Sequence, residues 1–158
     1  MKSNMSDTPT LWIRNHLAEK IRRHGVETYP HECCGALLGR DAEARGEMPG
    51  REVLGLHALV NRRDDSPRNR FSVTADDVRD AEKVAREQGL DVIGWYHSHP
   101  DHPARPSEFD REHAWPWYSY IIVSVHNGAS QEMTSWRLED DRTKFSPQAL
   151  EVRQRTAV

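Results

Sequence analysis

Cysteine is scarce in this chain, and its placement excludes two classes of small protein. The only two cysteines among the 158 residues, Cys33 and Cys34, are adjacent. The chain therefore has neither a disulfide framework nor the paired Cys-x-x-Cys hooks of a structural zinc site. Neighbouring residues of a strand face opposite sides, so we expect one thiol to pack inward and the other to face whatever lies at the strand's end. Two small buried side chains in a reducing compartment are favoured over a redox pair.

Long hydrophobic runs and an excess of one charge are also absent. The 22 basic and 25 acidic residues leave a formal charge of -3, which gives no overall attraction to nucleic acid or to an acidic membrane surface. No stretch is apolar for long enough to span a bilayer, and the polar segment 1–10 lacks the apolar core of a signal peptide. We expect a soluble cytoplasmic protein that binds neither nucleic acid nor membrane.

The length of the chain predicts one domain. A sequence of 158 residues is long enough for one hydrophobic core and too short for two ordinary domains. Residues 1–9 are polar and predict a disordered tail, so the domain is expected over residues 10–158. Its tryptophans Trp12, Trp115 and Trp117 are predicted to lie in the core.

Three segments combine apolar side chains at helical spacing with a cap or a stop: residues 10–24, 74–89 and 107–114. In the first, Gly25 supplies the stop. In the second and third, the hydroxyl of Thr74 or Ser107 is placed to cap the first turn. We therefore expect three helices, of which the third is short.

Six segments have the β-branched and aromatic composition of strands: residues 34–39, 51–60, 71–73, 91–96, 120–125 and 131–138. Asn127-Gly128, between the last two, is a strong hairpin signal. The polar segment 61–70 predicts a long loop, and the charged segment 139–158 predicts a final strand or helix. Helices mixed with a sheet of at least five strands, one hairpin included, predict an α/β or α+β fold with a mixed sheet.

Two histidines, separated by one residue, directly follow the predicted strand 91–96. Residues i and i+2 of an extended chain point the same way, so His97 and His99 can aim at one point while Ser98 faces away. Asp110 can add a carboxylate after the chain turns through three prolines. Two imidazoles and one carboxylate form a common ligand set for catalytic zinc, with the fourth position left for water.

A zinc hydrolase also needs a group that carries a proton from water to the leaving group. Glu32 is a candidate because it directly precedes the glycine-rich strand 34–39 and would lie at a sheet end. Spacing alone does not choose it over Glu27, Glu108 or Glu112.

Two blocks of the sequence resemble the JAMM (MPN+) metallopeptidases. One is His97-Ser98-His99-Pro100 followed by Ser107-x-x-Asp110. The other is Pro30-His31-Glu32-Cys33-Cys34-Gly35, which is similar to compact prokaryotic members associated with ubiquitin-like sulfur carriers. The two blocks together are much more specific than a bare His-x-His.

This resemblance implies a mixed sheet flanked by helices, similar to that of cytidine deaminases, with Zn2+ bound by His97, His99 and Asp110. It implies Glu32 as the general acid/base and Ser107 as a donor that stabilises the tetrahedral oxyanion. The implied activity is hydrolysis of an amide or isopeptide bond after the C-terminal Gly-Gly of a ubiquitin-like or sulfur-carrier protein. Precursor processing, amino-acid release and deconjugation would all use this site.

Two alternatives stay open at the level of the sequence. His97-x-His99-x-Asp101-His102 spells the His-x-His-x-Asp-His of metallo-β-lactamase-fold hydrolases, which would use Asp101 in place of Asp110. That fold requires further ligands downstream, where only His113 and His126 follow. Because MPN folds also serve as scaffolds, the other alternative is a non-catalytic protein-interaction module.

Overall fold

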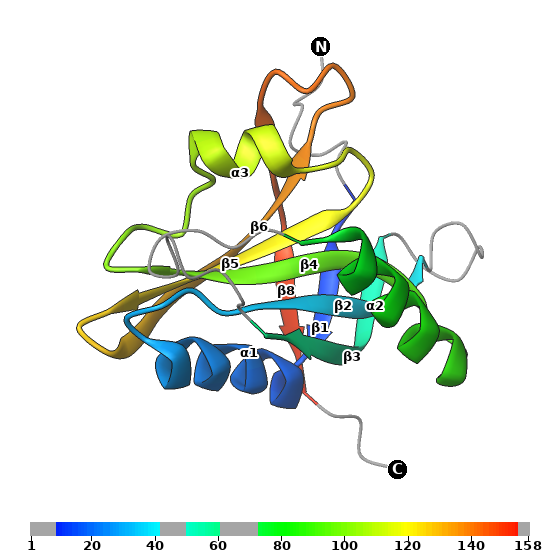
Figure 1. Cartoon of the computed structure of the whole chain (residues 1–158), viewed down its shortest axis with the longest axis horizontal. Coiled ribbons are helices and arrows are strands. Elements are labelled where there is room, and N and C mark those ends of the chain that lie inside the picture. Colours follow the sequence, from blue (N-terminus) through cyan, green and yellow to red (C-terminus); the bar gives the residue numbers. More distant parts are fainter. Residues whose placement is uncertain (1–8, 42–49, 61–72, 155–158) are drawn as a thin grey trace.

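The computed structural model describes residues 9–41, 50–60 and 73–154, and within them an eight-stranded sheet carries three helices (Figure 1). The strands are β1 (Leu11–Arg14), β2 (Cys34–Asp41), β3 (Arg51–Leu59), β4 (Asp91–Pro100), β5 (Ser119–His126), β6 (Ala129–Leu138), β7 (Phe145–Gln148) and β8 (Leu150–Arg153). The helices are α1 (Asn15–Thr28), α2 (Ala75–Glu87) and α3 (Glu108–His113). The predicted tail, apart from Pro9, the predicted loop 61–70 and residues 71–72 of the predicted strand 71–73 lie outside the described residues, and Val73 is not in a strand.

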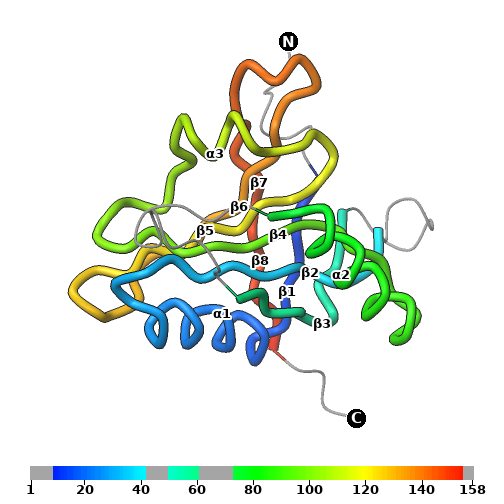
Figure 2. Tube along the Cα trace, in the orientation of Figure 1, coloured from blue at the N-terminus to red at the C-terminus, as the bar shows by residue number. Residues whose placement is uncertain are grey.

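The sheet is mixed, as predicted, and its strand order is β7-β6-β5-β4-β2-β3-β1-β8. The pairs β4–β5, β1–β3 and β1–β8 are parallel, and the other pairs are antiparallel. Figure 2 shows β4 running between β2 and β5 in the middle of the trace. The strand that carries the two histidines is therefore held on both sides.

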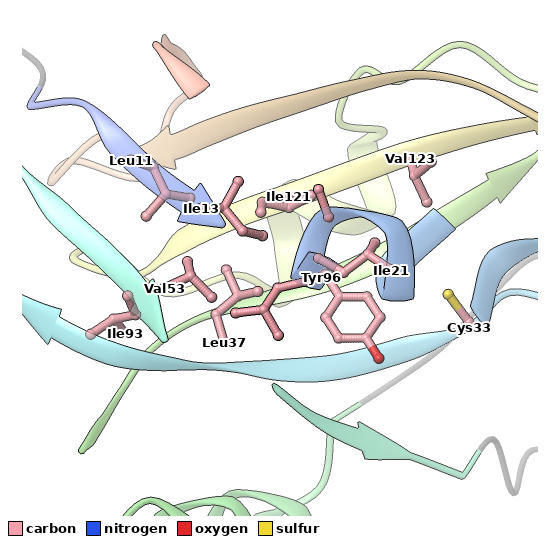
Figure 3. Packing of buried hydrophobic residues seen from close by; sticks show 12 residues of the cluster. Leu11, Ile13, Ile21, Cys33, Leu37, Val53, Ile93, Tyr96, Ile121 and Val123 are labelled. Atoms are coloured by element: carbon pink, nitrogen blue, oxygen red, sulfur yellow. The ribbon is translucent and has the colours of Figure 1, made fainter. Parts of the chain in front are cut away.

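Two hydrophobic clusters hold α1 and α2 on opposite faces of the sheet. Leu17, Ala18 and Ile21 of α1 pack with Leu37, Ile93, Tyr96, Ile121 and Val123 of the strands (Figure 3). Ala81 and Ala85 of α2 pack with Cys34, Ala36, Leu38 and Trp95. Since alternate residues of a strand share a face, His97 and His99 lie on the α2 side with Trp95. None of the helices in the described ranges is long and apolar enough to cross a membrane.

The first helix begins at Asn15, whereas the predicted helix begins at residue 10. Leu11–Arg14 forms β1, in which Leu11 and Ile13 are fully buried and alternate with less buried neighbours. The strand partners of β1 are β3 and β8, which come later in the chain. Because four residues also fit one helical turn, only these distant partners decide that the segment is extended.

Gly25 does not stop α1, which continues to Thr28. A Cβ atom at Gly25 would lie 3.0 Å from a methyl group of Val125 and 3.3 Å from Cβ of Ser98. Glycine at this position therefore lets the helix lie close to β4 and β5. Gly25 serves the packing of α1 on the sheet and does not end the helix.

Local signals located the other helices and the hairpin correctly. Thr74 and Asp77 form a capping box at the start of α2, and Ser107 and Asp110 form one at the start of α3. Asn127 and Gly128, with φ of 51° and 82°, connect β5 to β6. Positive φ at both central residues is the geometry that makes Asn-Gly a hairpin signal.

Gly35 lies beneath the ring of Tyr96, whose hydroxyl is 2.8 Å from Nδ1 of His24. A Cβ at Gly35 would be 2.3 Å from a ring carbon of Tyr96. We expect Gly35→Ala to lower the free energy of unfolding by about 1–3 kcal/mol, measured by urea denaturation. Gly55→Ala is the control, because its nearest neighbour is the end of the flexible Gln88 side chain at 3.1 Å. Equal stability of the two variants would contradict the packing assigned to Tyr96.

Candidate metal centre

The three predicted metal ligands come together at the carboxyl end of β4. Nε2 of His97 lies 3.2 Å from Nε2 of His99. The Asp110 carboxylate reaches both rings, with Oδ1 3.3 Å from Nε2 of His97 and Oδ2 3.1 Å from Nε2 of His99. One donor atom from each residue therefore lies within 4.8 Å of the others, and the group can hold a metal ion.

Local structure orients each of these side chains. β4 stays paired with β5 as far as Pro100, which keeps the two imidazoles on one face. Asp110 is the third residue of α3, where its backbone N–H donates to the hydroxyl of Ser107 at 3.0 Å and its carboxylate accepts from the Ser107 N–H at 2.8 Å. The capping box thus fixes the carboxylate and turns it toward the histidines.

The hydrogen bond behind the His99 ring suits a metal ligand. Nδ1 of His99 is 2.8 Å from the carbonyl oxygen of Pro103. A carbonyl only accepts, so Nδ1 of His99 carries a hydrogen, and Nε2 is the nitrogen that is directed at the possible metal position. This Nε2 lies 3.1 Å from an Asp110 oxygen, so the two atoms can bind one cation together. A backbone carbonyl behind a ligating histidine is also the usual support of a zinc ligand.

The electrostatics of the group favour the same chemistry. Burial alone raises the pKa of Asp110, but the adjacent His97 and His99 outweigh it and hold the pKa of Asp110 well below its usual range. The carboxylate is therefore ionised at neutral pH, as a hard oxygen ligand must be.

Glu32 is placed beside this group. It is 7% exposed and lines the same pocket as His97 and Asp110. Cys34 pairs with His97, and beyond this pair the Ser98 N–H donates to the Cys33 carbonyl at 3.2 Å. Glu32 directly precedes Cys33, so these contacts bring it to the end of β4 that carries the histidines.

The other three glutamates that spacing left open are unsuitable. Glu27, Glu108 and Glu112 are exposed and do not line the pocket. Glu108 forms an ion pair with Arg111 one turn along α3. Among the four candidates, Glu32 is thus the carboxylate that the fold brings to the metal group.

Ser107 lies at the edge of the same group and caps α3. Its exposed hydroxyl oxygen accepts from the Asp110 N–H. A hydroxyl that accepts a hydrogen bond still carries its own hydrogen and can donate it. Capping and donation to a bound substrate are therefore compatible at this residue.

Asp101 is not part of the metal group, and the metallo-β-lactamase interpretation is wrong. One carboxylate oxygen of Asp101 accepts from the Tyr29 hydroxyl at 2.7 Å, and the other accepts from the Asn127 N–H at 2.9 Å. These bonds tie the end of β4 to the α1–β2 connection and to the β5–β6 hairpin. Asp101 has a structural role where the alternative required a ligand.

The two cysteines separate as expected, one on each side of the sheet. Cys33 belongs to the α1 cluster and Cys34 to the α2 cluster, where it also lines the pocket. Burial raises the pKa of Cys33 to about 12 and that of Cys34 well above its ordinary value. Both side chains are therefore neutral thiols at pH 7.

A pocket of about 770 Å3 opens beside the metal group, with α2 on one side and α3 and the following segment on the other. Its lining includes Trp115 and Trp117, which are 62% and 45% exposed. The prediction that these tryptophans lie in the core is wrong. Aromatic composition does not distinguish a core residue from one that lines an open pocket, since both pack against apolar neighbours.

Comparison with known proteins identifies the family. Residues 14–139 match the family described as prokaryotic homologs of the JAB domain. The chain belongs to this family, which is the prokaryotic branch of the JAB/JAMM/MPN proteins.

Two curated relatives are similar to this chain in sequence. A desampylase of Haloferax volcanii is 32% identical over 112 residues, which cover 70% of this chain and 75% of the relative. The deubiquitinase BRCC36 of Xenopus tropicalis is 28% identical over 94 residues, covering 55% of this chain and 33% of that protein. The chain thus spans about a third of the length of BRCC36.

Solved structures share the fold. A protein from Salinibacter ruber is 44% identical with a TM-score of 0.69, and the match covers 89% of this chain and 90% of that chain. A JAB1/MPN domain protein from Archaeoglobus fulgidus is 17% identical with a TM-score of 0.53, covering 89% and 96% of the two chains. The α+β fold with a mixed sheet is therefore that of the JAB/MPN proteins.

Proposed function

We propose that this protein is a zinc metallopeptidase that hydrolyses the amide or isopeptide bond after the C-terminal Gly-Gly of a ubiquitin-like or sulfur-carrier protein. The observation that carries the proposal is the convergence of His97, His99 and Asp110 beside the buried Glu32 at a pocket. Membership of the family and the likeness to a desampylase and a deubiquitinase support the substrate class.

The residues of the site divide the chemistry between them. Zinc bound by His97, His99 and Asp110 would lower the pKa of a bound water toward neutrality and polarise the scissile carbonyl. Glu32 accepts a proton from the attacking water and passes it to the leaving nitrogen. Ser107 donates its hydroxyl hydrogen to the carbonyl oxygen as that oxygen gains negative charge.

A substrate that ends in two glycines suits this arrangement. Glu32 and His97 line the pocket at the end of the β2–β4 pair, and a backbone without Cβ atoms can approach them closely. The scaffold alternative does not require a buried glutamate beside the metal group, whereas the hydrolase uses Glu32 there.

Mass spectrometry of a ubiquitin-like sulfur carrier with a C-terminal extension after Gly-Gly tests the proposal. Zinc-loaded wild-type protein should produce a mass that ends at Gly-Gly, whereas Glu32→Gln and chelator-treated protein should not. Bound zinc without cleavage of any extended or lysine-linked carrier would favour the scaffold alternative. Absence of zinc binding would reject the metal centre itself.

Ser107→Ala should lower turnover by on the order of a hundredfold, as expected for the loss of one oxyanion donor. Because Ser107 also caps α3, alanine should in addition cost about 1 kcal/mol of stability. Ser107→Gly separates the two effects, since glycine is tolerated at an N-cap but has no hydroxyl. Single-turnover rates and thermal unfolding of both variants provide the measurement. If the glycine variant turns over at the wild-type rate, Ser107 is only a cap.

A further inference from the structure

The pocket beside the metal group changes character along β4. Glu32, His97 and Asp110 line its polar end. Trp95 lies two residues before His97 on the same face, and it belongs to a group of aromatic residues that line the pocket: Trp95, Trp115, Trp117, Tyr118, Tyr120 and Phe145. These rings contact one another, with centroids 5.9 Å apart for Trp95–Tyr118, 5.4 Å for Trp117–Tyr118 and 5.8 Å for Tyr120–Phe145. We call this part the aromatic subsite.

The exposed rings of the aromatic subsite are held in place. Trp117 has a φ of 87°, which is unfavourable for a bulky residue. The guanidinium of Arg51 lies 4.0 Å from the centre of its ring, and Arg51 is itself 3% exposed and directed at the Ile93 carbonyl and the Ser119 hydroxyl. Backbone strain of this kind persists where the surrounding structure enforces it, typically at ligand sites.

The Trp115 side of the subsite is fixed in a similar way. The backbone N–H of Trp115 donates to the Tyr120 hydroxyl at 2.8 Å, and the Arg142 guanidinium lies 5.6 Å from the Trp115 ring centre. Two tryptophans that remain 62% and 45% exposed are thus positioned before any substrate binds. Preorganised aromatic surface of this kind gains affinity when an apolar group covers it.

The spacing along β4 selects which part of a substrate can reach these rings. Two residues of a strand span about 7 Å, so Trp95 lies one side chain's length from the histidines. The two glycines before the cleaved bond present no side chain. The residue before them begins about 10 Å from the bond, at ~3.3 Å per residue. The side chain nearest the cleaved bond is therefore that of the residue attached to the leaving nitrogen.

We propose that the aromatic subsite binds a large apolar or aromatic side chain on the residue that leaves, so that Gly-Gly-X is cleaved preferentially when X is tryptophan, phenylalanine or leucine. This inference rests on the proposed peptidase function. A charged X would lose hydration against these rings, which an apolar side chain does not. In the pocket lining, Arg79 is already paired with Asp76 on α2.

Carriers that differ only in X provide the test with the zinc-loaded protein. We expect kcat/KM for X = Trp or Phe to exceed that for X = Gly by at least about tenfold. Trp117→Ala should reduce this ratio to near one. Trp12→Ala is the matched control: its ring lies on β1 with Arg153 at 5.1 Å and is absent from the pocket lining, so the ratio should stay at its wild-type value.

Binding to Glu32→Gln supplies a readout that does not depend on turnover. Zinc-loaded Glu32→Gln should bind Gly-Gly-Trp peptides at least about tenfold more tightly than Gly-Gly-Gly peptides in calorimetry. Equal cleavage of all carriers would overturn the subsite and leave the peptidase standing. If no carrier is cleaved, the proposed function fails, and the ratio of the two dissociation constants still decides whether the aromatic subsite exists.

Discussion

Glu32→Gln is expected to keep its zinc and to lose nearly all turnover. The change removes a proton carrier but no ligand, because the metal group consists of His97, His99 and Asp110. General acid–base groups contribute roughly a hundredfold to ten-thousandfold to rate, and one residue would serve here as both base and acid. Glutamine has nearly the shape of glutamate, so it should preserve the packing of a side chain that is 7% exposed.

The measurement pairs zinc content with single-turnover cleavage of an extended carrier. Glu27→Gln is the matched control, because Glu27 is an exposed glutamate of the same region and does not line the pocket. It should match the wild type in both assays. Substantial activity in Glu32→Gln would assign proton transfer to another group, and loss of zinc would show that Glu32 supports the metal instead.

Asp110→Asn should abolish stoichiometric zinc binding, whereas Asp101→Asn should retain it. Asparagine at position 110 keeps an oxygen that can accept from the Ser107 N–H, so α3 should remain capped. It removes the negative charge that faces both histidines at 3.1–3.3 Å. A neutral amide is a poor zinc ligand, and two imidazoles alone leave the site one protein ligand short of the catalytic set.

Asp101→Asn is a close control for that experiment. Asp101 has a φ of 59°, a conformation that asparagine tolerates well. The fold should therefore survive with at most one of the bonds to Tyr29 and Asn127 weakened. Metal analysis after dialysis distinguishes the variants, and loss of zinc in both, or in neither, would contradict the assigned ligand set.

Much of the metal group could be predicted from the sequence, because local structure orients its side chains. The alternation of a strand is enough to put His97 and His99 on one face. The capping pattern that starts α3 also positions Asp110, and both signals lie within a few residues of the side chains they orient. The resemblance of the two motif blocks then assigned roles to Glu32 and Ser107, which remain to be tested by mutation.

Spacing in the sequence did not decide which glutamate and which aspartate belong to the site. Contacts between distant segments made that choice. Glu32 differs from Glu27, Glu108 and Glu112 because the pairing of β2 with β4 brings the residues before Cys34 to the end of β4 that carries His97. Asp101 was excluded by its bonds to Tyr29 and Asn127, which lie 72 and 26 residues away in the sequence. Hydrophobic periodicity carries no information about such pairings.

The sequence by itself determined the two histidines, the capped helices and the hairpin, since each depends on neighbours along the chain. The tertiary structure decided that Leu11–Arg14 is a strand, because its partners β3 and β8 follow much later. It also decided that Trp115 and Trp117 line a pocket, because the buried Arg51 that holds Trp117 comes from β3. A local pattern that fits either a helix or a strand becomes one structure only when distant segments pair with it. Local sequence signals carry no information about that pairing.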